Sequence, residues 1–247
     1  MKQISEFTVN SHEEDFNGIV SASSVLRYMQ ETANLEHYYY GPTTDELRER
    51  NIAFVISRVA MKIYEPLEAF DKIKVESWLY EKRGFSFTRF GRICREGKTV
   101  AESSAIWAIV DTKTGELLRA DSFEPGFGAD GDSVGVPLPR LKIPTGIALE
   151  KTGAYRVGYE DADLNRHMNN TRYPDILCDF LPAKSGGEHF MNGMRVVEMT
   201  ISYLKEAKLG SSFEVYAGEK DGVFYIRTAL ENGDVGAEAS VKLEAIA

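Results

Sequence analysis

The sequence has little cysteine and little histidine for its length. Among 247 residues there are two cysteines, Cys94 and Cys178, and four histidines that lie far apart along the chain. Two thiols are too few for a disulfide framework or an all-cysteine zinc site, and the histidines lack the close spacing of a metal-binding pair. We therefore expect neither a metal nor any other cofactor.

Long apolar runs and basic charge are also scarce. No stretch reaches the roughly 20 consecutive apolar residues that span a bilayer, and the N-terminal MKQISEFTVN lacks the apolar core of a signal peptide. The formal net charge is −9, whereas binding to nucleic acid requires a basic surface. We expect a cytoplasmic protein with no membrane span and no nucleic-acid partner.

The first half of the chain has the pattern of a strand, a long helix and four further strands. Residues 3–10 alternate loosely between apolar and polar side chains, as a strand does. From Ser21 to Tyr40 the apolar residues recur at helical spacing. Ser21 is the expected N-cap and Gly41-Pro42 the expected stop. Four strands separated by short turns, typical of an antiparallel meander, are expected over residues 54–64, 72–80, 85–94 and 99–110.

The second half repeats this order after a stretch rich in glycine and proline. Residues 121–147 lose the periodicity and are typical of a linker. A strand near 150–158 and a polar turn lead to a helix that begins near Asn170 and ends before Pro182. Four more strands are expected over residues 195–205, 212–219, 223–231 and 235–245.

The two halves also resemble each other in their letters. DFNGIVSASSV, from Asp15, aligns with DLNRHMNNTRY, from Asp163, and REGKTVAESS aligns with ENGDVGAEAS. With the repeated order of elements, this favours duplication over chance similarity between two α+β domains. We expect a first repeat over residues 1–120, a linker over 121–147 and a second repeat over 148–247. In each repeat a helix would cover the apolar face of an antiparallel sheet, and the two sheets could share an edge.

The densest polar cluster precedes the second helix. Four residues recur there at every second position, namely Asp163, Asn165, His167 and Asn169. In an extended chain they would all point to one side. A carboxylate, an amide and an imidazole are the groups that a hydrolytic site needs for charge, carbonyl orientation and proton transfer. The competing interpretation is a capped turn, for which aspartate and asparagine suffice, although a turn has no need of the imidazole.

His167 immediately precedes the second helix. The free N–H groups and the positive dipole end of a helix N-terminus would stabilise the oxyanion formed when water attacks a carbonyl. The same field disfavours an imidazolium, so it would keep His167 neutral and able to accept a proton.

At these residues the sequence is similar to the acyl-acyl carrier protein (acyl-ACP) thioesterases of plants and bacteria. The stretch from Asp163 to Asn170, with Tyr173 after it, resembles the family pattern D-x-N-x-H-V-N-N-x-x-Y. A second stretch, from Ile201 to Ala207, resembles the family segment L-E-Y-R-R-E-C. The resemblance extends over essentially the whole chain.

The resemblance implies a fold, a reaction and a partner. The fold would be α+β, a tandem double hotdog with two antiparallel sheets each wrapped on a long helix. The reaction would be hydrolysis of fatty acyl-ACP to free fatty acid and holo-carrier, and the partner would be an acyl carrier protein bearing a fatty acyl-phosphopantetheine. The catalytic residues that the resemblance implies, all in the second repeat, are Asp163, Asn165, His167 and Glu206.

The residue after Glu206 sets this chain apart from many members of that family. They carry a cysteine there, long a candidate nucleophile, whereas this chain has Ala207. A covalent route through that position is excluded, and we expect direct attack by an activated water. Whether Asp163, His167 or Glu206 removes the proton of that water stays open.

The first repeat lacks the same chemistry. Its turn keeps Asp15 and Asn17. Ile19, however, stands in place of the histidine, and Pro66 falls near the place of the glutamate. Isoleucine cannot accept a proton and proline has no carboxylate. We therefore expect one site per chain, in the second repeat.

Three other functions stay open on the sequence alone: an acyl-CoA thioesterase, a hotdog hydratase or dehydratase, and a non-catalytic acyl-thioester binding protein. The sequence sets neither the preferred acyl length nor the oligomeric state, a homodimer being one option. Because acyl carrier proteins and this chain are both acidic, docking requires a local basic patch. The candidates for it are Arg83, Arg89, Arg92, Arg95, Lys98 and Arg166.

Overall fold

The computed structural model describes residues 2–183 and 187–246, so the outermost positions of the two expected repeats lie outside it. The first half contains β1 (Gln3–Thr8), α1 (Ala22–Tyr40), α2 (Thr44–Glu49), β2 (Ile52–Ile63), β3 (Lys72–Arg83), β4 (Ser86–Arg95), β5 (Lys98–Asp111) and the short β6 (Leu117–Leu118). The second half contains β7 (Glu150–Arg156), α3 (Tyr173–Asp179), β8 (Met194–Tyr203), β9 (Ser212–Lys220), β10 (Val223–Leu230) and β11 (Val235–Ala245). Every expected strand is present, whereas α2 and β6 were not expected.

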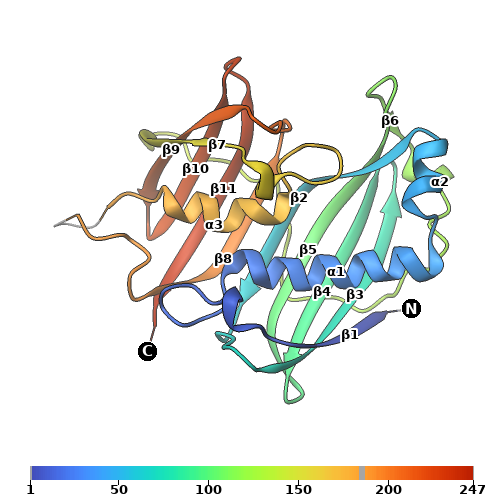
Figure 1. Ribbon diagram of the computed structural model, residues 1–247, viewed down its shortest axis with the longest axis horizontal. Helices are drawn as coiled ribbons and strands as arrows, with labels where there is room; N and C mark the ends of the chain where they lie inside the picture. Colours follow the sequence, from blue (N-terminus) through green and yellow to red (C-terminus); the bar gives the residue numbers. More distant parts are fainter. Residues whose placement is uncertain (1, 184–186, 247) are drawn as a thin grey trace.

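The strands form one continuous antiparallel sheet. Its order is β1-β3-β4-β5-β2-β8-β11-β10-β9-β7, with β6 paired to β5. The two halves meet where β2 pairs with β8, Arg58 lying opposite Ser202 and Met61 opposite Met199. Figure 1 shows the two strongly curved halves side by side. The α+β double hotdog is confirmed, and its two sheets share an edge.

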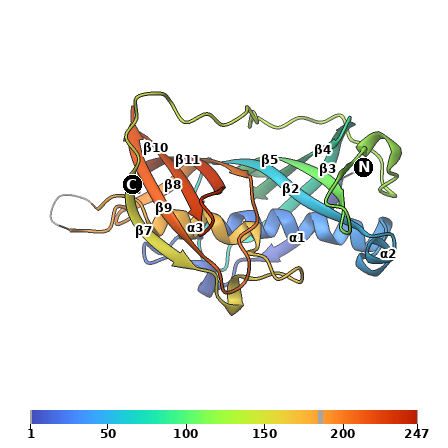
Figure 2. The same ribbon diagram turned by 90° about the horizontal axis from the view of Figure 1, so that it is seen from above.

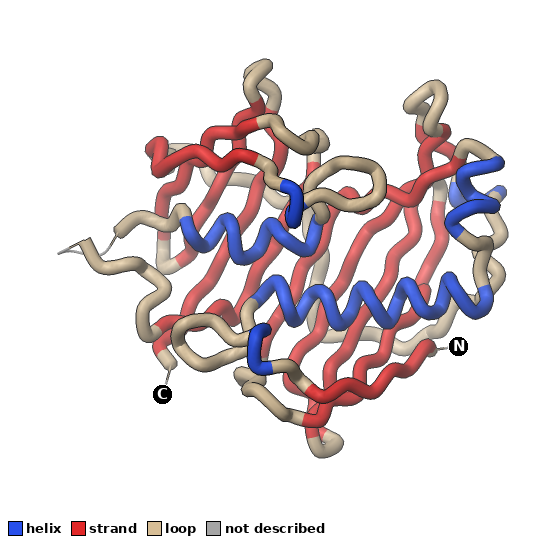
Figure 3. Tube along the Cα trace, viewed as in Figure 1, coloured by secondary structure: helices blue, strands red, loops and turns tan. Residues whose placement is uncertain are grey.

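Helices α1 and α3 lie on the same face of this sheet (Figure 3). Ser23 of α1 and Asp175 of α3 join them by two hydrogen bonds, from Ser23 N to Asp175 Oδ1 (2.9 Å) and from Asp175 N to Ser23 Oγ (3.0 Å). Beneath the helices, one apolar core crosses the junction of the two halves and includes Leu26, Val59, Met61, Leu177 and Ile201. Among the described residues, no helix is both long enough and apolar enough to cross a bilayer.

The two helices differ in length, and here the expectation of two long helices is corrected. α1 has 19 residues, is capped by the Ser21 side chain and ends at Gly41, as the sequence predicts. α3 has only seven residues. It follows a single 3-10 turn (Asn170–Arg172) and has Pro174 in its first turn. Because proline lacks a backbone N–H and Pro182 lies just beyond the end, only a short helix fits between them.

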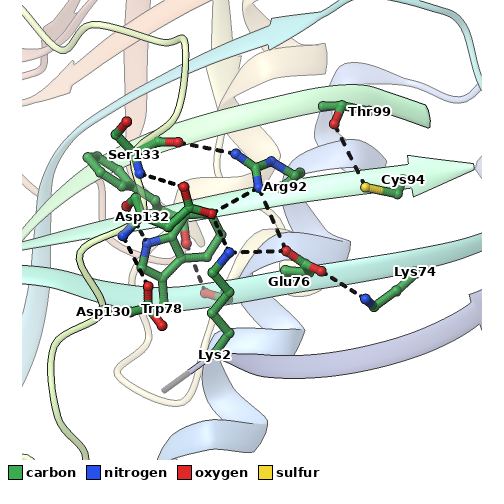
Figure 4. Close-up of polar contacts among 12 residues, drawn as sticks. Lys2, Lys74, Glu76, Trp78, Arg92, Cys94, Thr99, Asp130, Asp132 and Ser133 are labelled. Carbon is green, nitrogen blue, oxygen red and sulfur yellow. Dashed lines mark hydrogen bonds and ion pairs between the residues drawn. The ribbon is translucent and has the colours of Figure 1, made fainter. Parts of the chain in front are cut away.

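The linker is bonded to the face of the sheet that the helices leave open. Figure 2 shows it crossing that face from one half to the other. The Trp78 indole donates to Asp132 O (2.9 Å), and Arg92 donates to Ser133 O (3.1 Å). Figure 4 shows these contacts together with the ion pairs that Arg92 and Lys2 make to Asp132. Polar side chains of the sheet therefore hold the middle of a stretch that is typical of a loose linker.

One histidine of the fold is half-buried between aromatic rings. His37, in the last turn of α1, lies between the rings of Phe54 (5.0 Å) and Phe127 (4.8 Å). Burial, and next the positive charge of Arg89, lower the pKa of His37 from 6.5 to about 4. The folded protein thus holds this side chain neutral where the unfolded chain would protonate it.

This burial predicts acid sensitivity. As the pH falls from 6.5 towards 4, the unfolded chain takes up a proton at His37 that the folded chain does not, so stability falls across this window. His37→Leu is expected to reduce this loss of stability at low pH. Urea unfolding at several pH values from about 7 down to about 4 measures the free energy of unfolding. His12→Gln, at an exposed histidine, is the matched control, and an unchanged pH dependence in His37→Leu would refute the assignment.

Candidate functional site

The polar cluster of the second repeat folds into a tight turn, and the expected extended segment is therefore wrong. Asp163 N donates to His167 O (2.8 Å), and Arg166 N donates to Asp163 O (2.9 Å). The Asp163 carboxylate accepts from the backbone N–H groups of Asn165 (2.8 Å) and His167 (3.3 Å). Arg166 closes the turn in the left-handed region, with φ 62°. The turn forms in place of a strand because the short Asp163 side chain can bond backbone amides a few residues on, which an extended chain would hold out of reach.

The first repeat folds its corresponding turn in the same way. Asp15 N donates to Ile19 O (2.8 Å), and Gly18 N donates to Asp15 O (3.0 Å). The Asp15 carboxylate accepts from Asn17 N (2.7 Å). Gly18 holds the left-handed position, with φ 75°. The shared hydrogen-bond pattern places Ile19 where the second repeat has His167.

Each turn is also fixed against a loop from its own repeat. In the second repeat, Met168 N donates to Ala207 O (2.8 Å). In the first, Val20 N donates to Leu67 O (2.8 Å). The residue before the acceptor is Glu206 in one case and Pro66 in the other. The geometry therefore supports the sequence alignment of these two positions.

The contact with the loop after β8 brings two of the four expected catalytic side chains together. His167 pairs with Lys208 in an isolated antiparallel bridge. His167 Nδ1 lies 3.1 Å from Glu206 Oε2, and the two side chains are 26% and 58% exposed. Ala207, between Glu206 and Lys208, is buried, so its neighbours on either side share the open face with His167. This imidazole–carboxylate pair is accessible to solvent and can exchange a proton with a bound molecule.

The other two expected side chains take different places. Asp163 acts on His167 through the backbone, since its carboxylate accepts from the His167 amide rather than from the ring. Asn165 is exposed, and its side chain makes no hydrogen bond within the described residues. Its amide is therefore available to a ligand oxygen. The His167 Nε2 likewise has no hydrogen-bond partner in the described part of the chain.

The helix N-terminus does not offer the amides that the sequence led us to expect. Asn169 N donates to Asp161 O (2.8 Å), and Thr171 N donates to the Asn169 side chain (2.9 Å). Met168 N is already bonded to Ala207 O. The helix behind them is also short. The expectation of an oxyanion site formed by helix amides is therefore corrected, because these groups are used to fix the loop.

Three further residues were given no role by the sequence analysis, although Tyr173 and Tyr203 lie in the two matched stretches. Tyr173 is buried beneath the His167–Glu206 pair, and burial together with the Glu206 charge raises the pKa of Tyr173 to about 12. The ring of Tyr203 packs edge-on against Tyr173 at 5.2 Å. Gln30 of α1 accepts from the Asn170 side chain (2.7 Å). Nothing in the sequence could indicate Gln30, which lies 140 residues from its partner.

Two cavities lie near the helices. One of about 270 Å³ opens beside the turn of the first repeat, lined by residues that include Asp15, Ile19 and Pro66. The other, of about 30 Å³, lies beneath α1 next to Gln30. Its lining is mostly apolar and includes Leu26, Met29, Ala33, Ile56, Val59, Ala105 and Trp107. Gln30, which lines the second cavity, thus links it by a hydrogen bond to Asn170, three residues after His167.

Two other kinds of site have little support. Across residues 2–183 and 187–246, no three His, Cys, Asp or Glu side chains converge as metal ligands would. The letters G-x-S-x-G occur at residues 131–135, but Ser133 lies in the linker and no helix follows it as in a nucleophile elbow. Cys178 is buried, and burial raises the pKa of its thiol, so this cysteine is a core residue.

Most of the proposed basic patch is already neutralised. Four of the six candidate cations form ion pairs: Arg89 with Glu36, Arg92 with Glu102, Arg95 with Asp71 and Lys98 with Glu65. Arg83 and Arg166 are exposed and make no ion pair within the described residues. The sequence overestimated this patch because the fold brings these cations next to acidic residues that lie elsewhere in the chain, among them Glu102, directly opposite Arg92 on the neighbouring strand.

Comparison with known families gives two matches that together cover most of the chain. The model of the acyl-ACP thioesterase N-terminal domain matches residues 2–121, and that of the acyl-ACP thioesterase C-terminal domain matches residues 147–243. Among curated proteins, the chain is 23% identical over 246 residues to a chloroplastic palmitoyl-acyl carrier protein thioesterase of Arabidopsis thaliana. That match covers 93% of this chain and 55% of the relative. The chain thus spans about half the length of the curated relatives it matches.

Two solved structures have the same fold along nearly the whole chain. An acyl-ACP thioesterase from Bacteroides thetaiotaomicron gives a TM-score of 0.80 at 19% identity, covering 98% of each chain. A 12:0-ACP thioesterase from Umbellularia californica gives a TM-score of 0.78 at 17% identity, covering 99% of this chain and 98% of the other. At such identities the likeness establishes the fold alone.

Proposed function

Since the chain belongs to the acyl-ACP thioesterase family, we propose that it hydrolyses fatty acyl-ACP to free fatty acid and holo-carrier with an activated water. The site proposed for this reaction consists of Asp163, Asn165, His167 and Glu206. The observation that carries the proposal is the contact between His167 Nδ1 and Glu206 Oε2 at 3.1 Å. It supplies an oriented acid–base pair at an accessible position, as hydrolysis requires.

The proposed reaction needs only these side chains and water. Glu206 accepts a hydrogen bond from Nδ1–H of His167 and fixes the ring, so the unprotonated Nε2 can take a proton from water. The water oxygen then bonds to the thioester carbon, and the exposed Asn165 amide donates to the carbonyl oxygen as it becomes negative. Collapse of this intermediate breaks the carbon–sulfur bond, and the pair returns the proton to the leaving thiolate of the carrier's arm.

Asp163 has a positioning role in this proposal. Its carboxylate accepts from the amides of Asn165 and His167. It therefore sets the direction of both reacting side chains through the turn. Tyr173, buried beneath Glu206, stays neutral because its pKa is about 12, and it acts as an apolar floor.

We also propose the division into repeats at 1–120, 121–147 and 148–247, with chemistry in the second alone. It is supported by the two turns with the same hydrogen bonds, one ending in Ile19 and the other in His167. The first repeat would then serve to hold the acyl chain beneath α1. The cavity of about 30 Å³ there has room for about two waters, so a fatty chain would have to displace flexible side chains such as Met29.

One assay separates the proposed function from its alternatives. The protein is incubated with fatty acyl-ACP and with the matching acyl-CoA, and released fatty acid and thiol are measured. Faster release from acyl-ACP supports the proposal. Preference for the CoA thioester indicates the acyl-CoA thioesterase, hydration of an enoyl thioester without thiol release indicates the hydratase, and binding without turnover indicates a binding protein.

The asymmetry of the repeats predicts different results for one substitution in each of the two turns. His167→Ala is expected to lower turnover by about 10²–10⁴-fold, as the loss of an acid–base group does. Asp15→Ala, in the first repeat, is expected to cost about 0.5–2 kcal/mol of stability, the range of a lost side-chain bond to a backbone amide, and to leave turnover near that of the wild type. Thermal melts of both variants are measured beside the kinetics to separate stability from turnover. Half of the wild-type activity in His167→Ala would contradict the proposed catalytic role of His167.

The identity of residue 207 predicts a near-neutral substitution. Ala207 is buried in the apolar core, whereas the His167 and Glu206 side chains are open to solvent. Ala207→Cys is therefore expected to change turnover by less than about tenfold. Mass spectrometry after rapid mixing looks for an acyl-enzyme. A large gain in rate with a trapped acyl-cysteine would show that the water mechanism is wrong.

The apolar cavity predicts how the acyl-length preference can be changed. Ala33→Met narrows the space beneath α1 and is expected to shift the preference towards shorter chains, since overfilling a cavity excludes ligand atoms. Ala22→Met is the matched control, because Ala22 is a buried alanine of the same helix outside this cavity. Competition assays with mixed acyl-ACPs give the profile. An unaltered profile in a folded Ala33→Met variant would count against acyl binding there.

A further inference from the structure

The two equivalent turns differ at their left-handed position. In the first repeat this position is Gly18, with φ 75°, and in the second it is Arg166, with φ 62°. Glycine takes this conformation at no steric cost, whereas a residue with a Cβ is strained there. The turn of the second repeat would thus form at least as well with glycine. Arg166 keeps this conformation although its equivalent is glycine, which makes its side chain a candidate for a function.

Arg166 is one of three free cations around the reacting pair. It precedes His167, Lys205 precedes Glu206, and Lys208 pairs with His167 across the antiparallel bridge. All three side chains are exposed. None of them makes an ion pair or side-chain hydrogen bond in the described part of the chain. In a protein of net charge −9, three such cations form a local positive surface.

Exposed apolar side chains accompany these cations. Leu164, at the tip of the turn, is 81% exposed, and Leu204, next to Lys205, is 52% exposed. Such leucines would add apolar contact area if another protein bound over the cations. We name the five residues Leu164, Arg166, Leu204, Lys205 and Lys208 the site rim.

We propose that the site rim is the docking surface for the acidic face of the carrier protein, with Arg166 kept in its strained turn for that contact. The inference rests on the proposed function. It commits to the protein and not to the phosphate of its arm, because neither described cavity is lined by the three cations. A small anion needs converging donors in a concave site, whereas separate exposed cations suit a broad surface.

The central test uses a substitution that separates stability from docking. Arg166→Gly removes the charge and relieves the strain, so the melting temperature is expected to be no lower than that of the wild type. The KM for acyl-ACP is expected to rise about two- to fivefold, the range of one exposed charge contact. Arg166→Lys keeps the charge and is expected to restore most of the affinity. Arg83→Ser removes an exposed cation of the first repeat and is the charge control.

Three thioesters identify what the cations bind. Fatty acyl-ACP presents protein and phosphate, acyl-CoA presents phosphate alone, and an N-acetylcysteamine thioester presents neither. The increase in KM for Arg166→Gly is expected mainly with acyl-ACP, and rising salt is expected to reduce it because exposed charges are screened. An equal increase in KM with acyl-CoA would show that the cations bind the phosphate and not the carrier protein. If Arg166→Gly raised the KM for none of the thioesters, or if Arg83→Ser raised it equally, the site rim would not be the docking surface.

A binding measurement keeps this inference separate from the reaction. Calorimetric titration of holo-carrier into the wild type and into Arg166→Gly reports docking without turnover. Weaker binding to the variant supports the site rim as the docking surface. This holds even if no thioester is cleaved, a result that would contradict only the proposed function. Equal affinities in proteins that both cleave acyl-ACP would defeat the docking surface and leave the function in place.

Discussion

The pairing of β2 with β8 is the contact on which the rest of the molecule depends. It joins two curved sheets into one, so both helices lie on the same face and a single apolar core runs beneath them. In the described strand order β1 and β7 are the two ends, which limits unpaired strand groups. Through this junction Gln30 of the first half reaches Asn170 beside the site, and each half therefore contributes to the surroundings of the His167–Glu206 pair.

Within that frame, the two repeats keep one turn and use it differently. The backbone bonds of Asp15 and Asp163 are the same, since they depend on a carboxylate that accepts from an amide two residues on. The residue at the end of the turn differs, however, because it is Ile19 in the first repeat and His167 in the second. A turn that is stable by itself can thus present an imidazole in one repeat and an apolar side chain in the other, without a change of fold.

The face opposite the helices has a different chemistry. There the sheet presents Trp78, Arg92 and Glu102 to the linker, and their hydrogen bonds satisfy its backbone. On the helix side, by contrast, most contacts are apolar, with the buried Glu36–Arg89 ion pair as an exception. A buried ion pair adds little net stability but is costly to break, so it fixes the end of α1 against the sheet more than it strengthens the fold.

The sequence by itself determined the strands, the long first helix and the repeat, because the periods of apolar residues and the turn letters are local. It also singled out His167 and, through family resemblance, Glu206. It could not show that Asp163 to His167 form a turn, that α3 is short, or that most candidate cations are paired. Those depend on hydrogen bonds and ion pairs between distant segments. Only the tertiary structure decided that His167 meets Glu206, because the bond from Met168 to Ala207 brings together residues about 40 positions apart.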